Sequence, residues 1–182
     1  MPRVVGGELA GRTLHAPPGR GTRPTLDRVR EALFNIVAPR LSGAAVLDLY
    51  SGTGAIAIEA LSRGARLAIL VEPDGRARSV LFRNIASLGL EDRADVWPGT
   101  AERVVRRMPS GRFDLIFCDP PWEAGVSQRV QAELARLLTP DGIVVHERSE
   151  SLALEHPSLV LVDRRRYGRT HLDFYKKQEA PR

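Results

Sequence analysis

A four-residue run that follows an apolar segment carries the residue types needed for chemistry on an amine. Asp119-Pro120-Pro121-Trp122 comes directly after residues 113–118, which we interpret as a buried strand. Two consecutive prolines fix the backbone and remove two N–H donors, so the Asp119 carboxylate and the Pro120 carbonyl remain as acceptors. They suit an exocyclic amine on a planar ring that stacks on Trp122. The amine lone pair could then attack an electrophilic methyl group without a strong base. The alternative is a stiff turn without catalytic function.

A glycine loop forms the second motif. Gly52-Thr53-Gly54 lies where a short apolar segment gives way to a helical pattern, so its backbone can turn tightly and a ligand can approach closely. The following helix offers free N–H groups to an anion. Glu72 stands 20 residues after Gly52, where an acid can bind ribose hydroxyls. The ligand is then a dinucleotide or S-adenosylmethionine. Asp48 favours the second, because an acid attracts a sulfonium or ammonium group. A tight turn without a ligand is the alternative.

The pattern of elements predicts a sheet that would bring both motifs to one edge. Apolar strands and amphipathic helices alternate from residue 44, which indicates a mostly parallel sheet with helices on both faces. Ligand sites of such sheets lie beyond the carboxyl ends of the strands. The expected strands are 44–49, 66–71, 94–97, 113–118 and 142–146, and the expected helices are 54–63, 74–88, 101–108 and 126–138.

The two ends of the chain are expected to differ from this alternation. Residues 3–5 and 12–15 suggest a short hairpin, followed by a loop rich in Pro, Gly and Arg. Thr25 is expected to cap the next helix, which Pro39 ends. Residues 159–162 and 170–175 predict two antiparallel strands joined by a basic turn at 164–168.

Length and composition exclude several classes of protein. With 182 residues, 43% hydrophobic and 27% charged, the chain suits one globular domain rather than a disordered or disulfide-framework protein. The lone Cys118 fits a reducing cytoplasm, and we find no signal peptide or membrane segment. We interpret Cys118 as a core residue. The four histidines have no metal-like spacing, so no zinc site is expected.

The charge is concentrated at the two ends. The net charge is +5. Residues 1–40 carry seven Arg against three acids, and residues 163–182 carry five Arg and two Lys against three acids. Because the Arg guanidinium binds phosphate through a planar fork, this placement favours a nucleic-acid partner. A solvated basic surface is the alternative. The candidate RNA-binding residues are Arg3, Arg12, Arg20, Arg23, Arg164, Arg165, Arg166 and Arg169.

These motifs resemble a known group of enzymes. Asp119-Pro120-Pro121-Trp122 resembles the Asn/Asp/Ser-Pro-Pro-aromatic motif of S-adenosylmethionine-dependent amino-methyltransferases, which act on adenine, cytosine, glutamine or guanine amines. Residues 3–14 and 23–35 resemble the RsmD-like family of bacterial 16S rRNA guanine-N2 methyltransferases. The resemblance continues through 47–54 and 166–168 and covers nearly the whole chain.

The resemblance implies an α/β, Rossmann-like class I methyltransferase fold. Its seven-stranded, mostly parallel sheet would end in an antiparallel C-terminal hairpin and carry a short N-terminal extension. Residues 1–182 would form one domain, with residues 1–24 as the extension and 25–182 as the catalytic core. The implied reaction methylates guanine N2 in 16S rRNA, at guanine 966, on the RNA or a partly assembled small subunit. A cytoplasmic monomer without metal is expected.

The resemblance also implies the residues of the site. The catalytic residues would be Asp119, Pro120, Pro121 and Trp122. The chain departs from its relatives at Thr100, where an acid or Asn is common, and at Trp122, where a smaller aromatic is common. The cofactor-binding residues would be Thr25, Asp48, Tyr50, Ser51, Gly52, Thr53, Gly54, Glu72, Pro73, Thr100, Ala101 and Asp119.

Other functions stay open at this point. An amino-methyltransferase for DNA adenine would need a DNA-reading domain, for which 182 residues leave little room. An enzyme for protein glutamine would not need two basic ends. A nucleotide-binding Rossmann module without methyl transfer would leave the Asp-Pro-Pro-Trp run without a role.

Overall fold

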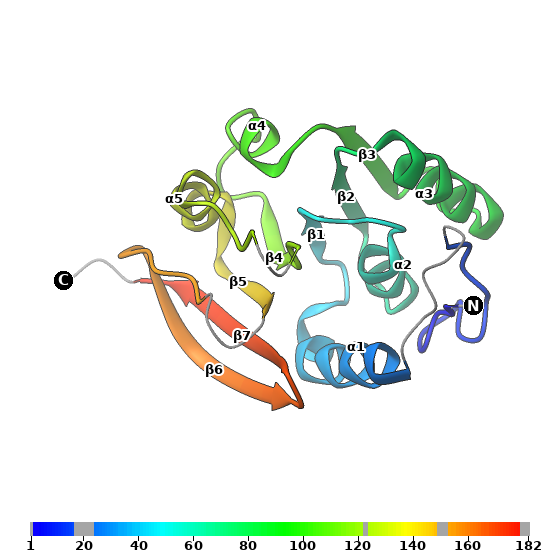
Figure 1. Cartoon of the computed structure of the whole chain (residues 1–182), viewed down its shortest axis with the longest axis horizontal. Helices are drawn as coiled ribbons and strands as arrows, with labels where there is room; N and C mark the ends of the chain where they lie inside the picture. The colour runs from blue at the N-terminus through cyan, green and yellow to red at the C-terminus, as the bar shows by residue number, and fades with distance from the viewer. Residues whose placement is uncertain (1, 17–23, 122–123, 149–152, 179–182) are drawn as a thin grey trace.

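A seven-stranded sheet forms the centre of the computed structural model, which describes residues 2–16, 24–121, 124–148 and 153–178. The strand order is β3-β2-β1-β4-β5-β7-β6. The first five strands of this order are parallel, whereas β7 is antiparallel to both β5 and β6 (Figure 1). This architecture confirms the predicted sheet. The strands are β1 (Ala45–Asp48), β2 (Leu67–Glu72), β3 (Ala94–Pro98), β4 (Phe113–Cys118), β5 (Leu138–Arg148), β6 (Leu159–Tyr167) and β7 (Thr170–Lys177).

Helices cover both faces of the sheet and bury two apolar clusters. The first cluster packs α1, α2 and α3 against one face, and the second packs α4 and α5 against the other (Figure 1). On α1 the buried residues Val29, Leu33 and Val37 recur at the spacing of one helical face. The helices are α1 (Pro24–Val37), η1 (Ala38–Arg40), α2 (Ala55–Ser62), α3 (Gly75–Leu88), α4 (Ala101–Val105) and α5 (Gln128–Leu137).

A buried glutamate fastens the N-terminal segment to α2. Glu59 is 0% exposed, and its carboxylate accepts hydrogen bonds from the Val5 and Gly6 backbone N–H groups, both at 2.7 Å. The Arg63 Nε donates to the same carboxylate at 2.8 Å. Burying a charge is tolerated when it is paired and hydrogen-bonded in this way. The segment therefore packs as part of the body and lies beside α2 and α3.

Two of the three expectations about the ends need correction. Thr25 is not the N-cap of α1, because the helix already begins at Pro24. The expected N-terminal hairpin is present in short form: Arg3 and Thr13 form an antiparallel bridge, and the Val4 and Leu14 N–H groups donate to the Arg12 and Pro2 carbonyls at 2.9 and 2.8 Å. The basic run 164–167 is not a turn: it continues β6, and the chain reverses at Gly168-Arg169. Pairing with β7 holds these arginines in extended form.

We expect Phe34 to be a principal anchor of α1. Its ring is fully buried, lies 5.8 Å from the Phe117 ring and is covered by the Arg63 guanidinium. Phe34→Ala should lower the free energy of unfolding by about 3–5 kcal/mol, measured by urea denaturation. Phe82, which is 54% exposed on α3, provides the matched control, and Phe82→Ala should change it by less than about 0.5 kcal/mol. Equal effects of the two variants would contradict this packing.

Candidate active site

Four acidic residues that are far apart in the sequence lie at the carboxyl ends of four adjacent strands. Asp48 pairs in register with Leu70 of β2 and Phe117 of β4, and Cys118 pairs with His146 of β5. Because side chains alternate along a strand, these registers direct all four acids to the face of the sheet that carries the first apolar cluster. We call Glu72, Asp48, Asp119 and Glu147 the carboxylate row.

Asp48 is the most deeply buried acid of the carboxylate row, and one of its carboxylate oxygens is unsatisfied. It is 2% exposed, and its Oδ2 has no hydrogen-bond partner among the described residues. Its Oδ1 accepts a long hydrogen bond of 3.4 Å from the Tyr50 N–H. Burial, with repulsion from Asp119, raises the pKa of Asp48 to about 7. The fold thus holds an acceptor that a cationic ligand would satisfy.

The glycine loop follows Asp48 and is held from two sides. Gly52 and Gly54 both have positive φ, at 52° and 83°, and Gly54 precedes the first residue of α2. A Cβ on Gly54 would clash with Leu81, whereas a Cβ on Gly52 would meet no atom within 4 Å. The Gly52 N–H donates to the Glu72 carboxylate at 2.8 Å. The loop therefore packs closely at Gly54 and leaves open space at Gly52 for a ligand.

Asn84 is a positioning residue that sequence reasoning missed. It is fully buried on α3, and its amide donates to the Thr53 carbonyl at 2.9 Å and to the His15 carbonyl at 3.1 Å. Its Oδ1 accepts from the His15 N–H at 2.7 Å. One amide thus joins the glycine loop to the N-terminal segment. Only an Asn inside an otherwise amphipathic helix could have pointed to this role.

Asp119 stands at the rim of the site. It is exposed to solvent, while the surrounding protein still desolvates its carboxylate and raises its pKa. Pro120 is buried and Pro121 is exposed. No hydrogen bond among the described residues uses the Asp119 carboxylate or the Pro120 carbonyl. The described fold therefore leaves both acceptors unused, and their role toward a ligand stays a prediction. Trp122 lies outside the described residues.

The remaining predicted cofactor contacts surround the glycine loop. The Ser51 hydroxyl donates a hydrogen bond to the Asp48 carbonyl at 2.9 Å, which ties the glycine loop to the end of β1. After β3, the exposed Thr100 is the N-cap of α4, and the buried Ala101 is the first residue of that helix. Pro73 is exposed after Glu72. The Tyr50 hydroxyl is buried without a partner among the described residues. Backbone placement brings these residues to the same edge; the side chain of Thr25 lies outside the described part.

The C-terminal arginines are more paired than the sequence suggests. Asp173, which is fully buried, accepts two hydrogen bonds from Arg164, at 2.7 and 2.8 Å, and one from Arg148 at 2.7 Å. Arg165 pairs with Asp163 at 2.9 Å. Arg166 donates from Nε to the Gly168 carbonyl. Arg164 is therefore a structural partner of Asp173 whose guanidinium is still 43% exposed.

The N-terminal arginines are also partly engaged in the fold. Arg3 forms the backbone bridge to Thr13, and Arg12 donates to the Ser87 carbonyl at 3.2 Å. Both side chains stay exposed. Arg20 and Arg23 lie outside the described residues. The exposed basic side chains thus remain available for an RNA backbone, and their role stays a prediction.

Cys118 and His146 lie side by side on neighbouring strands, yet they do not form a nucleophilic pair. Both are buried. Burial raises the pKa of the Cys118 thiol, and it lowers the pKa of His146 to about 4. A neutral thiol beside a neutral imidazole is no activated thiolate. Cys118 is a core residue, as predicted.

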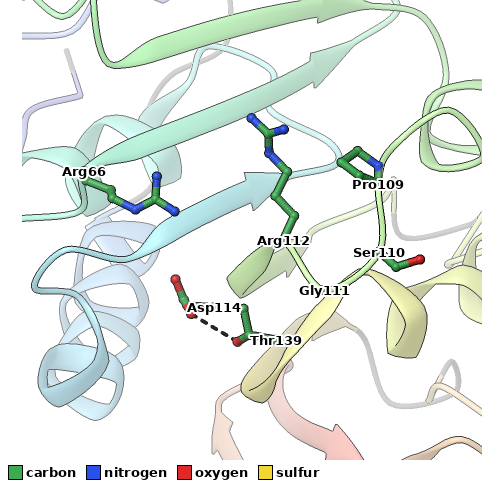
Figure 2. A pocket seen from close by; sticks show the side chains of 7 residues that line it. All are labelled: Arg66, Pro109, Ser110, Gly111, Arg112, Asp114 and Thr139. Carbon is green, nitrogen blue, oxygen red and sulfur yellow. Dashed lines mark hydrogen bonds between the residues drawn. The ribbon is translucent and has the colours of Figure 1, made fainter.

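A pocket at the opposite edge of the sheet does not coincide with the motifs. It has a volume of about 470 Å³ and is lined by Arg66, Arg112, Asp114 and Thr139 among others (Figure 2). Figure 2 shows these side chains around the amino ends of the parallel strands, and Asp114 accepts from Thr139 at 3.1 Å and from the Ala45 N–H at 2.8 Å. Because its acid is already satisfied, we place the chemistry at the carboxylate row instead.

Metal-ligand clusters and membrane-spanning helices are both absent from the described residues. No group of three or more His, Cys, Asp or Glu side chains there is arranged to hold a metal ion. No helix in the same ranges has the length and apolar character to cross a membrane.

Residues 2–176 match a family described as "Conserved hypothetical protein 95". The chain belongs to this family. It is 36% identical over 185 residues to "Putative rRNA methyltransferase YlbH" of Bacillus subtilis, covering 97% of this chain and 99% of that protein. It is 36% identical over 145 residues to "Ribosomal RNA small subunit methyltransferase D" of Escherichia coli, covering 80% and 70%. The family resemblance drawn from the motifs is confirmed.

A solved structure supports the fold of this family member. "Putative methyltransferase yhhF from Escherichia coli" superposes with a TM-score of 0.84 at 30% identity and covers 98% of each chain. The Rossmann-like methyltransferase fold predicted from the motifs is confirmed as well.

The raised pKa of Asp48 predicts a pH-dependent change in stability. An acid whose folded pKa exceeds its unfolded value destabilises the fold as pH rises from about 4 to 7, and the loss then levels off. Asp48→Asn should match the wild type near pH 4 and exceed its unfolding free energy at pH 8 by up to about 4 kcal/mol. Urea denaturation across this range measures the difference.

The exposed Asp92 supplies the matched control for this experiment. Asp92→Asn should follow the wild-type curve at both pH values. An Asp48→Asn protein that is no more stable than the wild type at pH 8 would show that the buried carboxylate carries no such penalty.

Proposed function

We propose that this protein transfers a methyl group from S-adenosylmethionine to the exocyclic N2 amine of a guanine in small-subunit ribosomal RNA. The observation that carries the proposal is the pair of free acceptors, the Asp119 carboxylate and the Pro120 carbonyl, placed beside the glycine loop and Asp48. Family membership and the rRNA methyltransferase names of two relatives support the coarser part of this proposal, methyl transfer to rRNA.

The residues present fit the cofactor. The unpartnered Asp48 Oδ2 would accept from an ammonium group or face a sulfonium, and the open space at Gly52 admits a ligand close to the backbone. Glu72, at the end of β2, would bind the two ribose hydroxyls. The Glu72 carboxylate already accepts hydrogen bonds from the Gly52 and Asp74 N–H groups. The ribose hydroxyls would compete with these N–H groups for its two oxygens. Thr100 and Ala101 would border the adenine.

The chemistry needs orientation more than proton transfer. S-adenosylmethionine supplies a methyl group bound to a positively charged sulfur. The Asp119 carboxylate and the Pro120 carbonyl would accept the two N–H hydrogens and hold the nitrogen lone pair in line with the methyl carbon. The N–C bond forms as the C–S bond breaks, and the sulfur keeps the electron pair. The methylated nitrogen then carries a positive charge and releases one proton to water at the exposed rim of the site. Trp122 would stack on the base.

The substrate base must leave its helix to reach this site. Guanine N2 is engaged in pairing within a duplex, so the enzyme would act on an unstacked base or a loop. The exposed arginines near both ends of the chain would hold the RNA phosphates. We propose Arg3, Arg12, Arg165, Arg166 and Arg169 for this contact among the described residues.

The first test is methylation with isotope-labelled S-adenosylmethionine. The protein is incubated separately with unmodified small ribosomal subunits, naked 16S RNA, duplex DNA and cell protein, and each product is hydrolysed for analysis. We expect label in N2-methylguanosine from the subunit or its RNA. Label only in DNA adenine or in protein would keep the chemistry and overturn the substrate. No label in any sample, with NAD binding instead, would refute the methyltransferase proposal.

Substitution of Asp119 separates catalysis from cofactor binding. Asp119→Ala should lower kcat by at least about 100-fold, because one of the two acceptors that orient the amine is lost. The Kd of S-adenosylmethionine, measured by calorimetry, should change by less than about tenfold. Asp119→Asn keeps a carbonyl acceptor and should retain more activity than Asp119→Ala. Full activity of Asp119→Ala would exclude the proposed orientation.

Substitution of two basic residues tests the RNA contact. Arg165→Ala combined with Arg166→Ala should weaken RNA binding and reduce the slope of log K against log salt by roughly 1.5, since about two phosphate contacts are lost. Arg106→Ala with Arg107→Ala, an exposed pair after α4, is the matched control and should leave the slope unchanged. Identical slopes for all three proteins would place the RNA elsewhere.

A further inference from the structure

Glu147 occupies the position next to Asp119 in the sheet. Strands β4 and β5 are neighbours in the sheet (Figure 1), and Cys118 of β4 is in register with His146 of β5. Asp119 directly follows β4, and Glu147 is the next residue of β5. Phe117 and Val145 are also in register, and both belong to the first apolar cluster. Because side chains alternate along a strand, Glu147 projects to the face of the first apolar cluster, and it interacts electrostatically with the Asp119 carboxylate.

The fold does not use the Glu147 carboxylate for its own hydrogen bonds. Among the described residues it has no partner, although the residue is half-buried. Burial and the negative charge of Asp119 raise the pKa of Glu147. The neighbouring Arg148 points to the other side of the strand and pairs with Asp173 at 2.7 Å. The Glu147 oxygens are not among the buried atoms that lack a partner, so they reach the solvent side of the site and can accept from a ligand.

A second observation shows that this edge is prepared for donors and positive charge. Asp48 is buried in the same row, its Oδ2 is unpartnered, and it interacts electrostatically with Asp119. A sulfonium group against the carboxylate row would favour the ionised forms of Asp48, Asp119 and Glu147, because an opposite charge lowers the pKa of a carboxyl. Glu147 would then be a hydrogen-bond acceptor.

The number of acceptors matches one base edge. Guanine presents three N–H hydrogens side by side, one on N1 and two on N2, whereas the amine of adenine lies beside a ring nitrogen that is itself an acceptor. Asp119, Pro120 and Glu147 offer three acceptors. Resting on the proposed function, we propose that Glu147 is the residue that selects guanine, by accepting the N1–H hydrogen while Asp119 and Pro120 hold the N2 amine.

Selection would work through rejection as well as attraction. A base with a lone pair on N1 would place that lone pair against the Glu147 carboxylate, and two acceptors facing each other in a partly dry site repel. Asp119 and Pro120 alone cannot make this distinction, because they contact only the amine. The tetrad would thus orient any exocyclic amine, and Glu147 would decide which base is methylated.

The test compares two RNAs that differ at the target base. One RNA carries guanine and the other carries 2-aminopurine, which keeps the N2 amine but has a lone pair on N1. We expect wild-type kcat/KM to be at least about 100-fold lower for 2-aminopurine. In Glu147→Gln the amide can accept from N1–H or donate to the N1 lone pair, so the two values should fall within about tenfold. RNA with 6-thioguanine, which keeps N1–H, controls for the altered group at C6 and should react like guanine in the wild type.

Two further variants and one binding measurement complete the design. Glu147→Leu should lose guanine methylation while the Kd of S-adenosylmethionine stays within about tenfold of the wild-type value, which shows that the site is still folded. Glu91→Gln, at an exposed position, should keep the wild-type ratio between the two RNAs. Glu147→Gln with an unchanged ratio would overturn the role of Glu147 alone. Wild-type protein that leaves guanine N2 unlabelled in the RNA would instead overturn the proposed function.

Discussion

The parallel register of β2, β1, β4 and β5 is the constraint on which the candidate site depends. It brings four acids from distant parts of the chain to one edge and one face of the sheet. Because side chains alternate, a slip of one residue between β1 and β4 would direct Asp48 and Asp119 to opposite faces. Both faces of β1 and β4 are apolar and buried, so the register is fixed by how their side chains pack against the helices on each face rather than by an alternation of polar and apolar residues. Packing therefore positions the chemistry.

The row of carboxylates also opposes the stability that packing provides. Asp48 lies in the interior with an oxygen that no described residue satisfies, and its raised pKa measures the unfavourable burial of its charge. Glu59 is equally buried, but two backbone N–H groups and Arg63 satisfy it. The contrast separates a structural acid from one kept available for a ligand. Strain of this kind is typical of functional sites.

Local patterns predicted most of the fold and much of the candidate site. The strand before Asp119 has the predicted bounds, and the glycine loop stands where the change of periodicity indicates. What local patterns could not show depends on contacts between distant residues. In the sequence Arg164 resembles part of a basic turn, whereas in the fold it lies on β6 and pairs with Asp173 of the neighbouring strand β7. Glu147 gains its significance only from lying beside Asp119, and Asn84 only from reaching the loop.

The electrostatics of the site fit a division of the substrate between two regions. The carboxylate row repels phosphate, so an RNA backbone would be excluded from that edge of the sheet. Exposed arginines such as Arg12 and Arg165 would hold the backbone instead. A base, by contrast, carries its N–H donors toward the carboxylates without bringing a charge. On the proposed function, the field that would attract a sulfonium would also separate the base from the backbone. A base already extruded from its helix satisfies both regions at once, which favours a looped guanine over one in a duplex.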